Sequence, residues 1–125
     1  MLKKLAKMMK EVADDEDVLA VLLFGSYVRD VKFSDIDICI IVQPKSFDAL
    51  SLSKKRLEYL TDFPEYDVRI FQQLPLYVRI RVLKEGKIVF CRDEDALYDL
   101  AVGVVREFEY FKPIYKTYLE GVLHA

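Results

Sequence analysis

Hydrophobic positions change their period several times along the chain. Within residues 2–13, apolar side chains recur three or four positions apart with lysines between them, which predicts a helix. Residues 18–24, VLAVLLF, are apolar throughout, as expected for a strand that is buried on both faces. Residues 36–42, IDICIIV, form a second such segment, which is rich in β-branched residues and is followed by Pro44. The first third of the sequence therefore predicts one helix and two buried strands.

The rest of the chain alternates between strand-like and helix-like patterns. A strand is predicted where Tyr66, Val68 and Ile70 alternate with other residues in EYDVRIF, and a shorter one in KIVFC. Gly86 is expected to cap the short helix before KIVFC. Pro113 is expected to bend or interrupt the last and longest helix. The predicted elements are helices over about residues 46–61, 76–85 and 94–122 and strands over residues 65–71 and 87–91.

The order of these elements predicts the fold class. Strands that alternate with helices indicate an α/β layered domain, here a small mixed (α+β) sheet of about four strands flanked by helices. The connection between the first two strands is too short for a parallel crossover, which takes about a dozen residues or more, so these strands should be antiparallel. We expect one domain over residues 1–125, with its motif core at residues 18–72.

Composition and charge narrow the classes of function. The 125 residues carry 19 basic and 21 acidic side chains, a net charge of −2, which disfavours nucleic acid as the main ligand. No apolar run approaches a membrane-spanning length and the N-terminus lacks a secretory hydrophobic core, so no membrane association is expected. Cys39 and Cys91 lie in strand-like segments and are expected to be reduced thiols of a cytoplasmic protein.

Two aspartates one residue apart stand where the second strand begins. Side chains alternate along a strand, so Asp35 and Asp37 should point to one face, with backbones about 6.5 to 7 Å apart. Desolvated carboxylates repel each other unless a cation lies between them. Oxygen ligands of this kind suit one or two Mg²⁺ ions, or Mn²⁺, and Mg²⁺ typically completes its shell with substrate phosphates. The alternative is a solvated strand start without a metal.

Residues that suit a phosphate, and a third carboxylate, accompany this pair. Gly25 and Ser26 end the first strand where a short helical turn is expected, and its amides and hydroxyl suit a phosphate. Arg29 follows close to one helical turn later and can reach the same anion. If the third strand lies beside the second, Asp67 would face the aspartate pair. Asp67 would then complete the metal site and accept a proton from an attacking hydroxyl.

Each of these residues also has a purely structural interpretation. The Gly-Ser pair alone is typical of an ordinary turn. Arg29 beside Asp30 would form a surface ion pair of little energetic weight, and Asp67 would pair with Arg69 or Arg79. The combination of all these residues in one chain favours a site for a metal-bound nucleoside triphosphate.

Taken in chain order, these motifs resemble those of a known superfamily. GSYVR at residues 25–29, SDID at 34–37 and Asp67 resemble the G-S-x-x-R, D-x-D and later strand aspartate of nucleotidyltransferases of the DNA polymerase β superfamily. From about residue 18 to the C-terminus, the chain looks like the minimal nucleotidyltransferases of archaea and bacteria. The resemblance implies a nucleotidyltransferase fold. It also implies in-line attack of a hydroxyl on the α-phosphorus of a nucleotide, with release of pyrophosphate.

The resemblance implies phosphate binding by the turn and metal binding by the three aspartates. Two departures from the family pattern affect the turn. Asp30 stands where the family usually has glycine, and the interval to the D-x-D pair is shorter than usual. The implied cofactor-binding residues are Gly25, Ser26 and Arg29, and the implied catalytic and metal-binding residues are Asp35, Asp37 and Asp67.

The resemblance also implies a partner. Minimal nucleotidyltransferases commonly pair with a small helical HEPN-type RNase in a toxin–antitoxin system, in which the transferase is the antitoxin and adenylylates a tyrosine of the toxin from ATP. The sequence is compatible with such an adenylyltransferase, and the aromatic stretch at residues 108–123 offers a docking face for a homodimer or a heterocomplex. The expected contact residues are Tyr110, Tyr115 and Tyr118, whereas Phe108 and Phe111 are expected to pack on the chain's own sheet. Two alternatives stay open: a catalytically weak binding module that neutralises a partner by complex formation, and transfer to a small molecule.

Overall fold

The computed structural model describes residues 2–24 and 36–123. Its four strands form one mixed sheet in the order β3-β2-β1-β4, in which only β2 and β3 are parallel. The predicted α/β fold class and the antiparallel pairing of the first two strands are confirmed. The elements are α1 (Leu2–Asp14), β1 (Val18–Phe24), β2 (Ile36–Val42), α2 (Ala49–Asp62), β3 (Tyr66–Ile70), the 3₁₀ turn η1 (Phe71–Gln73), α3 (Leu76–Glu85), β4 (Lys87–Cys91) and α4 (Glu94–Leu123).

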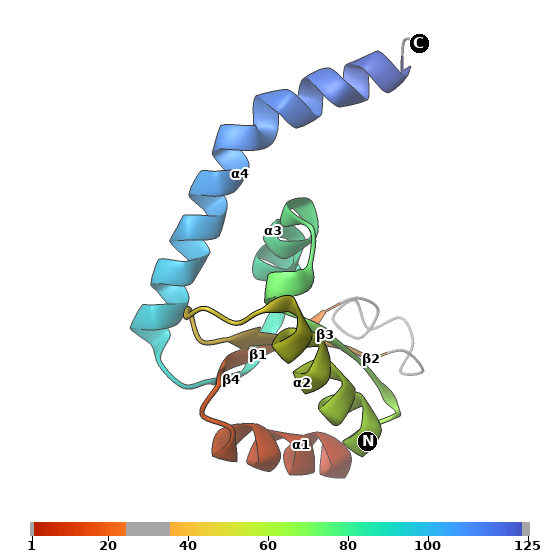
Figure 1. Cartoon of the computed structure of the whole chain (residues 1–125), viewed down its shortest axis with the longest axis vertical. Helices are drawn as coiled ribbons and strands as arrows, with labels where there is room; N and C mark the ends of the chain where they lie inside the picture. The colour runs from red at the N-terminus through yellow and green to blue at the C-terminus, as the bar shows by residue number, and fades with distance from the viewer. Residues whose placement is uncertain (1, 25–35, 124–125) are drawn as a thin grey trace.

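Most predicted boundaries agree with these elements to within one to three residues. The second helix begins later than predicted because Asp48 caps it, with its carboxylate accepting a hydrogen bond of 2.7 Å from the backbone N–H of Ser51. Pro113 does not end α4, which runs on to Leu123 and changes direction in its upper part (Figure 1). The predicted short turn after β1 lies outside the described residues.

Gly86 ends α3 as predicted, but not in the left-handed conformation that helix-capping glycines commonly adopt. Its backbone is extended, with φ −71° and ψ 152°. A Cβ at this position would lie 2.4 Å from the carbonyl oxygen of Val82 and 3.0 Å from Leu22. Glycine is therefore required here chiefly because a Cβ would collide with the carbonyl oxygen of Val82 in the last turn of α3 itself; the side chain of Leu22 in β1 adds a second, looser contact.

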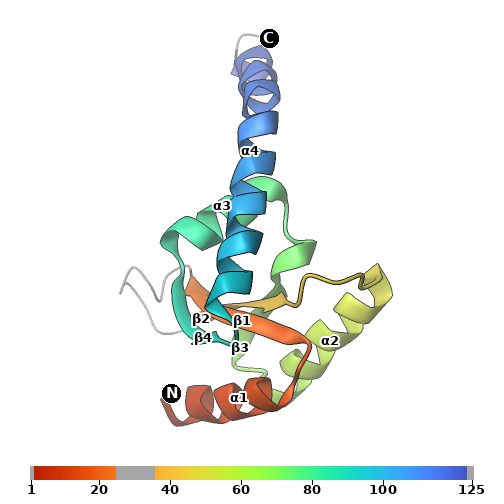
Figure 2. The same cartoon turned by 90° about the vertical axis from the view of Figure 1, so that its left-hand side faces the viewer.

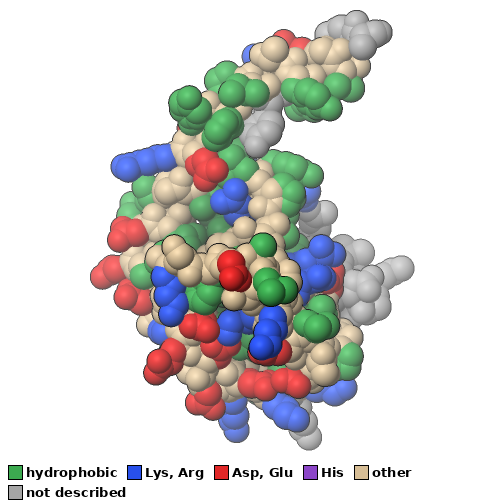
Figure 3. Space-filling view, in the orientation of Figure 1, with side chains coloured by type: hydrophobic (Ala, Val, Ile, Leu, Met, Phe, Trp, Pro, Cys, Tyr) green, Lys and Arg blue, Asp and Glu red, His purple; other side chains and the backbone are tan. Residues whose placement is uncertain are grey.

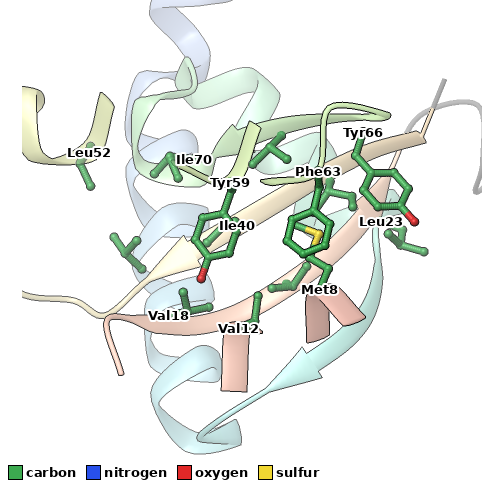
Figure 4. Close-up of a cluster of buried hydrophobic side chains, with 14 residues drawn as sticks. Met8, Val12, Val18, Leu23, Ile40, Leu52, Tyr59, Phe63, Tyr66 and Ile70 are labelled. Carbon is green, nitrogen blue, oxygen red and sulfur yellow. The ribbon is translucent and has the colours of Figure 1, made fainter. Parts of the chain in front are cut away.

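Helices cover both faces of the sheet. In Figures 1 and 2, α1 and α2 lie on one side, and α3 and α4 on the other. Alternation along β2 divides its side chains accordingly: Ile38 and Ile40 pack with α1 and α2, whereas Cys39 and Ile41 pack with α3 and α4. Figure 4 shows the first of these clusters, in which Met8 of α1 and Tyr59 of α2 meet the sheet. Both faces of the central strands are thus buried, as the unbroken apolar runs of β1 and β2 predicted.

Two further sequence-based expectations bear on this core. Cys39 and Cys91 are both free thiols, and burial raises the pKa of the Cys39 thiol to about 12. Among the helices that the structure describes, none combines the length and apolarity needed to cross a membrane.

The Arg92 side chain joins three parts of the fold. Its Nε donates to the carbonyl oxygen of Val18 at 2.8 Å, and its Nη2 donates to the carbonyls of Val12, Ala13 and Asp15 at 3.1 Å. The last carbonyls of a helix have no partner within the helix, and a cation near them is favourable. Arg92, directly after β4, therefore caps α1 and fixes it to the start of β1.

A second polar network fixes α2 to the turn between α1 and β1. Lys55 and Tyr59 of α2 each donate a hydrogen bond of 2.8 Å to Asp15 Oδ2. Lys55 Nζ also lies 3.3 Å from Asp17 Oδ2. Burial alone would raise the pKa of Asp15, but the hydrogen bonds from Lys55, Tyr59 and the Asp17 amide outweigh it and lower that pKa. Burial would likewise lower the pKa of Lys55, but Asp15 and Asp17 raise it. Asp15 and Lys55 are therefore both charged near neutral pH.

Replacing Arg92 should destabilise the protein. Arg92→Ala removes four side-chain hydrogen bonds and leaves the carbonyls at the end of α1 without that partner, so we expect a loss of about 1 to 3 kcal/mol in the free energy of unfolding. Urea unfolding monitored by circular dichroism measures it. Arg81→Ala is the matched control, because among the described residues the ion pair of Arg81 is an exposed one with Glu85, and the substitution should change stability by less than about 0.5 kcal/mol. Equal effects of the two substitutions would contradict the role given to Arg92.

Replacing Asp15 should change how stability depends on pH. A carboxylate whose pKa is lowered by folding stabilises the protein above its ordinary pKa, and this contribution disappears as the pH falls through the lowered value. Asp15→Asn should therefore cost about 1 to 2 kcal/mol at pH 7, and its difference from the wild type should shrink below about pH 4. Urea unfolding between pH 3 and about pH 8 measures this. Asp14→Asn, an exposed neighbour, is the control, and a pH-independent difference for Asp15→Asn would refute the proposed charge network.

Candidate active site

Asp37 and Asp67 lie opposite each other at the starts of two neighbouring strands. β2 and β3 are parallel, and in their register Asp37 pairs with Asp67, followed by Ile38 with Val68. Neighbouring strands are about 4.8 Å apart, and residues paired in parallel strands point to the same side of the sheet. The structure therefore brings these two predicted carboxylates together, in the arrangement expected if the third strand lies beside the second.

The two carboxylates lie on the face of the sheet that α3 and α4 cover elsewhere. Asp37 alternates with Ile38, which packs under α1 and α2, so its side chain is on the opposite face, next to Cys39 in the α3 and α4 cluster. At this edge the face is open, because the Asp67 side chain is 43% exposed and the Arg69 side chain 48%. A ligand from solvent can therefore reach Asp67, and Asp37 beside it is half-buried.

Arg69 is the described side chain that holds Asp67. Its Nε donates to Asp67 Oδ1 at 3.2 Å and its Nη2 to Asp67 Oδ2 at 3.4 Å. The structural interpretation of Asp67, an ion pair with a neighbouring arginine, is thus also realised, and Arg69 rather than Arg79 is the partner. Arg79 instead lies 3.8 Å from Glu107 of α4. A half-exposed pair of this kind contributes little to stability, so a competing cation can displace Arg69 from Asp67.

Four predicted site residues lie outside the described part of the chain: Gly25, Ser26, Arg29 and Asp35. The described ends of the segment that carries them are nevertheless fixed. β1 ends at Phe24 and β2 begins at Ile36, and Phe24 pairs with Asp37 in the antiparallel register. The described residues on either side of these four, Phe24 and Ile36, therefore lie at the edge of the sheet where Asp37 and Asp67 pair.

Carboxylates also gather elsewhere in the structure. Within residues 2–24 and 36–123, no group of three or more His, Cys, Asp or Glu side chains is arranged to hold a metal ion. The acidic residues between α1 and α2 line a cavity of about 370 Å³. There Lys55 and Tyr59 already bind Asp15, and burial together with a hydrogen bond to Asp62 raises the pKa of Glu11. This cavity lies under the opposite face of the sheet from Asp37 and Asp67.

Sequence reasoning assigned no site role to Arg69. It was expected only as one of two alternative ion-pair partners of Asp67. Its position two residues after Asp67 on a strand, and hence on the same face, was the signal that placed it next to the site.

Comparison with known proteins gives three findings. The family described as "Polymerase beta, Nucleotidyltransferase" matches residues 4–95, from α1 to the start of α4. A Methanocaldococcus jannaschii protein, MJ1547, which is named as a protein adenylyltransferase, is 35% identical over 75 residues. This alignment spans 58% of the present chain and only 56% of that relative.

Solved structures resemble the whole fold. A chain of a toxin–antitoxin complex with AMP-PNP superposes with a TM-score of 0.72 at 17% identity, covering 97% of both chains. A chain from the complex of tri-AMPylated Shewanella oneidensis HEPN toxin with MNT antitoxin gives a TM-score of 0.69 at 16% identity, covering 97% of the present chain and 94% of that one. At these identities the resemblance establishes the fold.

Proposed function

Since the chain belongs to the polymerase β nucleotidyltransferase family, we propose that it transfers AMP from ATP to a hydroxyl group of a protein. The observation that carries this proposal is the pairing of Asp37 with Asp67 on an open face of the sheet. The name of the Methanocaldococcus jannaschii relative supports a protein as the acceptor. The toxin–antitoxin structure with AMP-PNP supports ATP as the nucleotide.

The two described carboxylates suit a divalent cation. Both supply hard oxygen ligands, and they face the same space from neighbouring strands. We propose that Asp37, Asp67 and the neighbouring Asp35 hold two Mg²⁺ ions, for which Mn²⁺ would substitute. When bound, such ions neutralise charge on the triphosphate and on its leaving group. The half-exposed position of Asp67 leaves room for this, because its present partner Arg69 is only weakly held.

The side chains then have separate roles in an in-line displacement. We propose that Gly25, Ser26 and Arg29 bind the triphosphate and hold its α-phosphorus in front of Asp37. The acceptor oxygen forms a bond to the α-phosphorus while the bond to pyrophosphate breaks, and the electron pair leaves on pyrophosphate. The hydroxyl proton passes to the carboxylate of Asp67. AMP ends on the acceptor, and pyrophosphate is released.

The acceptor in this proposal is a tyrosine of a HEPN-type toxin, so that the chain acts as its antitoxin. The fold likeness to chains of toxin–antitoxin complexes supports this partner. The net charge of −2 supports a protein rather than a nucleic acid as the substrate. We expect the reaction to take place in the cytoplasm, where ATP and Mg²⁺ are supplied.

One observation favours a second function. Asp67 is paired with Arg69, as it would be in a catalytically weak module that neutralises a partner by complex formation alone. Such a module would bind a HEPN-type protein without transferring AMP and would not need Asp37. The two substitutions below separate these functions.

Removing either paired carboxylate should abolish transfer. Asp37→Asn and Asp67→Asn should each lower the rate of AMP transfer to a HEPN-type protein by about 100-fold or more, because each removes a charged oxygen ligand from the site. Incorporation of labelled AMP in the presence of Mg²⁺ measures the rate. Asp99→Asn, an exposed aspartate of α4, is the matched control and should leave it unchanged. Undiminished transfer by Asp37→Asn would remove the proposed site.

Replacing Arg69 should show whether Asp67 binds a metal ion or serves only the ion pair with Arg69. Arg69→Met removes the cation that competes for Asp67, so Mn²⁺ should bind more tightly by about 2- to 10-fold, as measured by calorimetry. Because the pair is half-exposed, thermal stability should change little. Arg81→Met, whose arginine lies in another exposed pair, is the control for removal of a positive charge. Weaker Mn²⁺ binding by Arg69→Met would argue that Asp67 serves the ion pair and not a metal.

A further inference from the structure

An apolar groove lies between α3 and the C-terminal half of α4. It encloses about 680 Å³, and its described lining residues are Tyr77 of α3 and Phe108, Ile114, Tyr118 and Leu119 of α4. Figure 3 shows hydrophobic side chains gathered along the upper part of the molecule, where α4 runs, while charged side chains gather lower down. Because the groove has an apolar lining, it does not suit a nucleotide or another phosphate-bearing ligand.

The groove continues a stripe that is buried in the first half of α4. Apolar residues at positions 97, 101, 104, 108, 111, 115, 118 and 122 recur alternately four and three residues apart, which is a heptad pattern over almost four repeats. Leu97 and Val104 are 8% and 6% exposed, but Phe111, Tyr118 and Val122 are 37%, 69% and 57% exposed. The apolar heptad pattern of α4 therefore continues beyond the residues that the rest of the described chain buries.

The helix that packs on the N-terminal half of α4 indicates which kind of element fits the C-terminal half. α3 packs against the N-terminal half of α4, with Val82 in the same cluster as Leu97 and Val104. The ion pair between Arg79 of α3 and Glu107 of α4, at 3.8 Å, lies near the end of this contact. Beyond it, α4 projects away from the sheet (Figures 1 and 2). A heptad stripe packs against another helix, so the exposed part is matched to a helix that continues the line of α3.

We infer that this groove docks an apolar helix of the acceptor protein; the inference rests on the proposed function. The groove is built from α3 and α4, and these helices cover the same face of the sheet on which Asp37 and Asp67 lie. A protein held there is on the side from which its hydroxyl must approach the two carboxylates. A second copy of this chain in the groove would bring no hydroxyl of the proposed acceptor to that side.

The test uses the full chain and a HEPN-type protein, the class of acceptor proposed above. Tyr118→Glu places a charge in the groove at a position that is already exposed, so the fold should be kept. It should weaken binding of the acceptor by about tenfold or more in calorimetry, and raise the KM for the acceptor in AMP transfer by a similar factor. The kcat at saturating acceptor and the affinity for ATP should stay within about twofold, since neither depends on the groove. Tyr110→Glu, an exposed tyrosine of the same helix outside the groove lining, is the matched control and should leave all four quantities unchanged.

The outcomes separate the docking surface from the reaction. Acceptor affinity unchanged by Tyr118→Glu, with the circular dichroism of a folded protein, would overturn the docking proposal even where AMP is still transferred. Loss of affinity in Tyr118→Glu together with no AMP transfer by the wild type would keep the docking surface and refute the proposed reaction. A wild-type chain that is dimeric by light scattering and becomes monomeric in Tyr118→Glu would identify a second copy as the occupant and overturn the proposal. The absence of any binding between the wild type and the HEPN-type protein would overturn it as well.

Discussion

The parallel register of β2 and β3 is the constraint on which the candidate site depends. It sets Asp37 against Asp67, and the apolar residues that alternate with them hold it in place, because Val68 and Ile70 must point into the core under α1 and α2. A slip of one residue would turn Asp67 toward that core and expose Val68 to solvent. Hydrophobic burial on one face of the sheet thus fixes the positions of the carboxylates on the other.

The crossover between these two strands keeps the site open. Parallel neighbours need a long connection, and here it contains α2, which packs on the face opposite to Asp37 and Asp67. Two polar networks that stabilise the chain lie toward that covered side, where Arg92 caps α1 and Asp15 binds Lys55 and Tyr59 of α2. The sheet therefore separates these two networks from Asp37 and Asp67.

α4 divides into two halves with different roles. Its first half completes the core beside α3, and its second half carries the same apolar stripe beyond the end of that contact. A helix whose stripe is only half covered has its remaining apolar surface in water, which is unfavourable unless a partner removes it. The groove beside Tyr77 and Tyr118 gives this surface a shape that suits one more helix.

The sequence by itself determined the elements and the family. Uninterrupted apolar runs are buried wherever they pack, so β1 and β2 were predicted to the residue, and the spacing of GSYVR, SDID and Asp67 identified the nucleotidyltransferase family that the match over residues 4–95 confirms. Tertiary structure decided which elements are neighbours. Period and propensity are local properties, and they do not say that β3 lies beside β2, that Arg69 rather than Arg79 pairs with Asp67, or where α3 ceases to cover α4. These three features depend on contacts between residues that are far apart in the chain. Only the packed core fixes the register of the strands and the extent of the contact between α3 and α4.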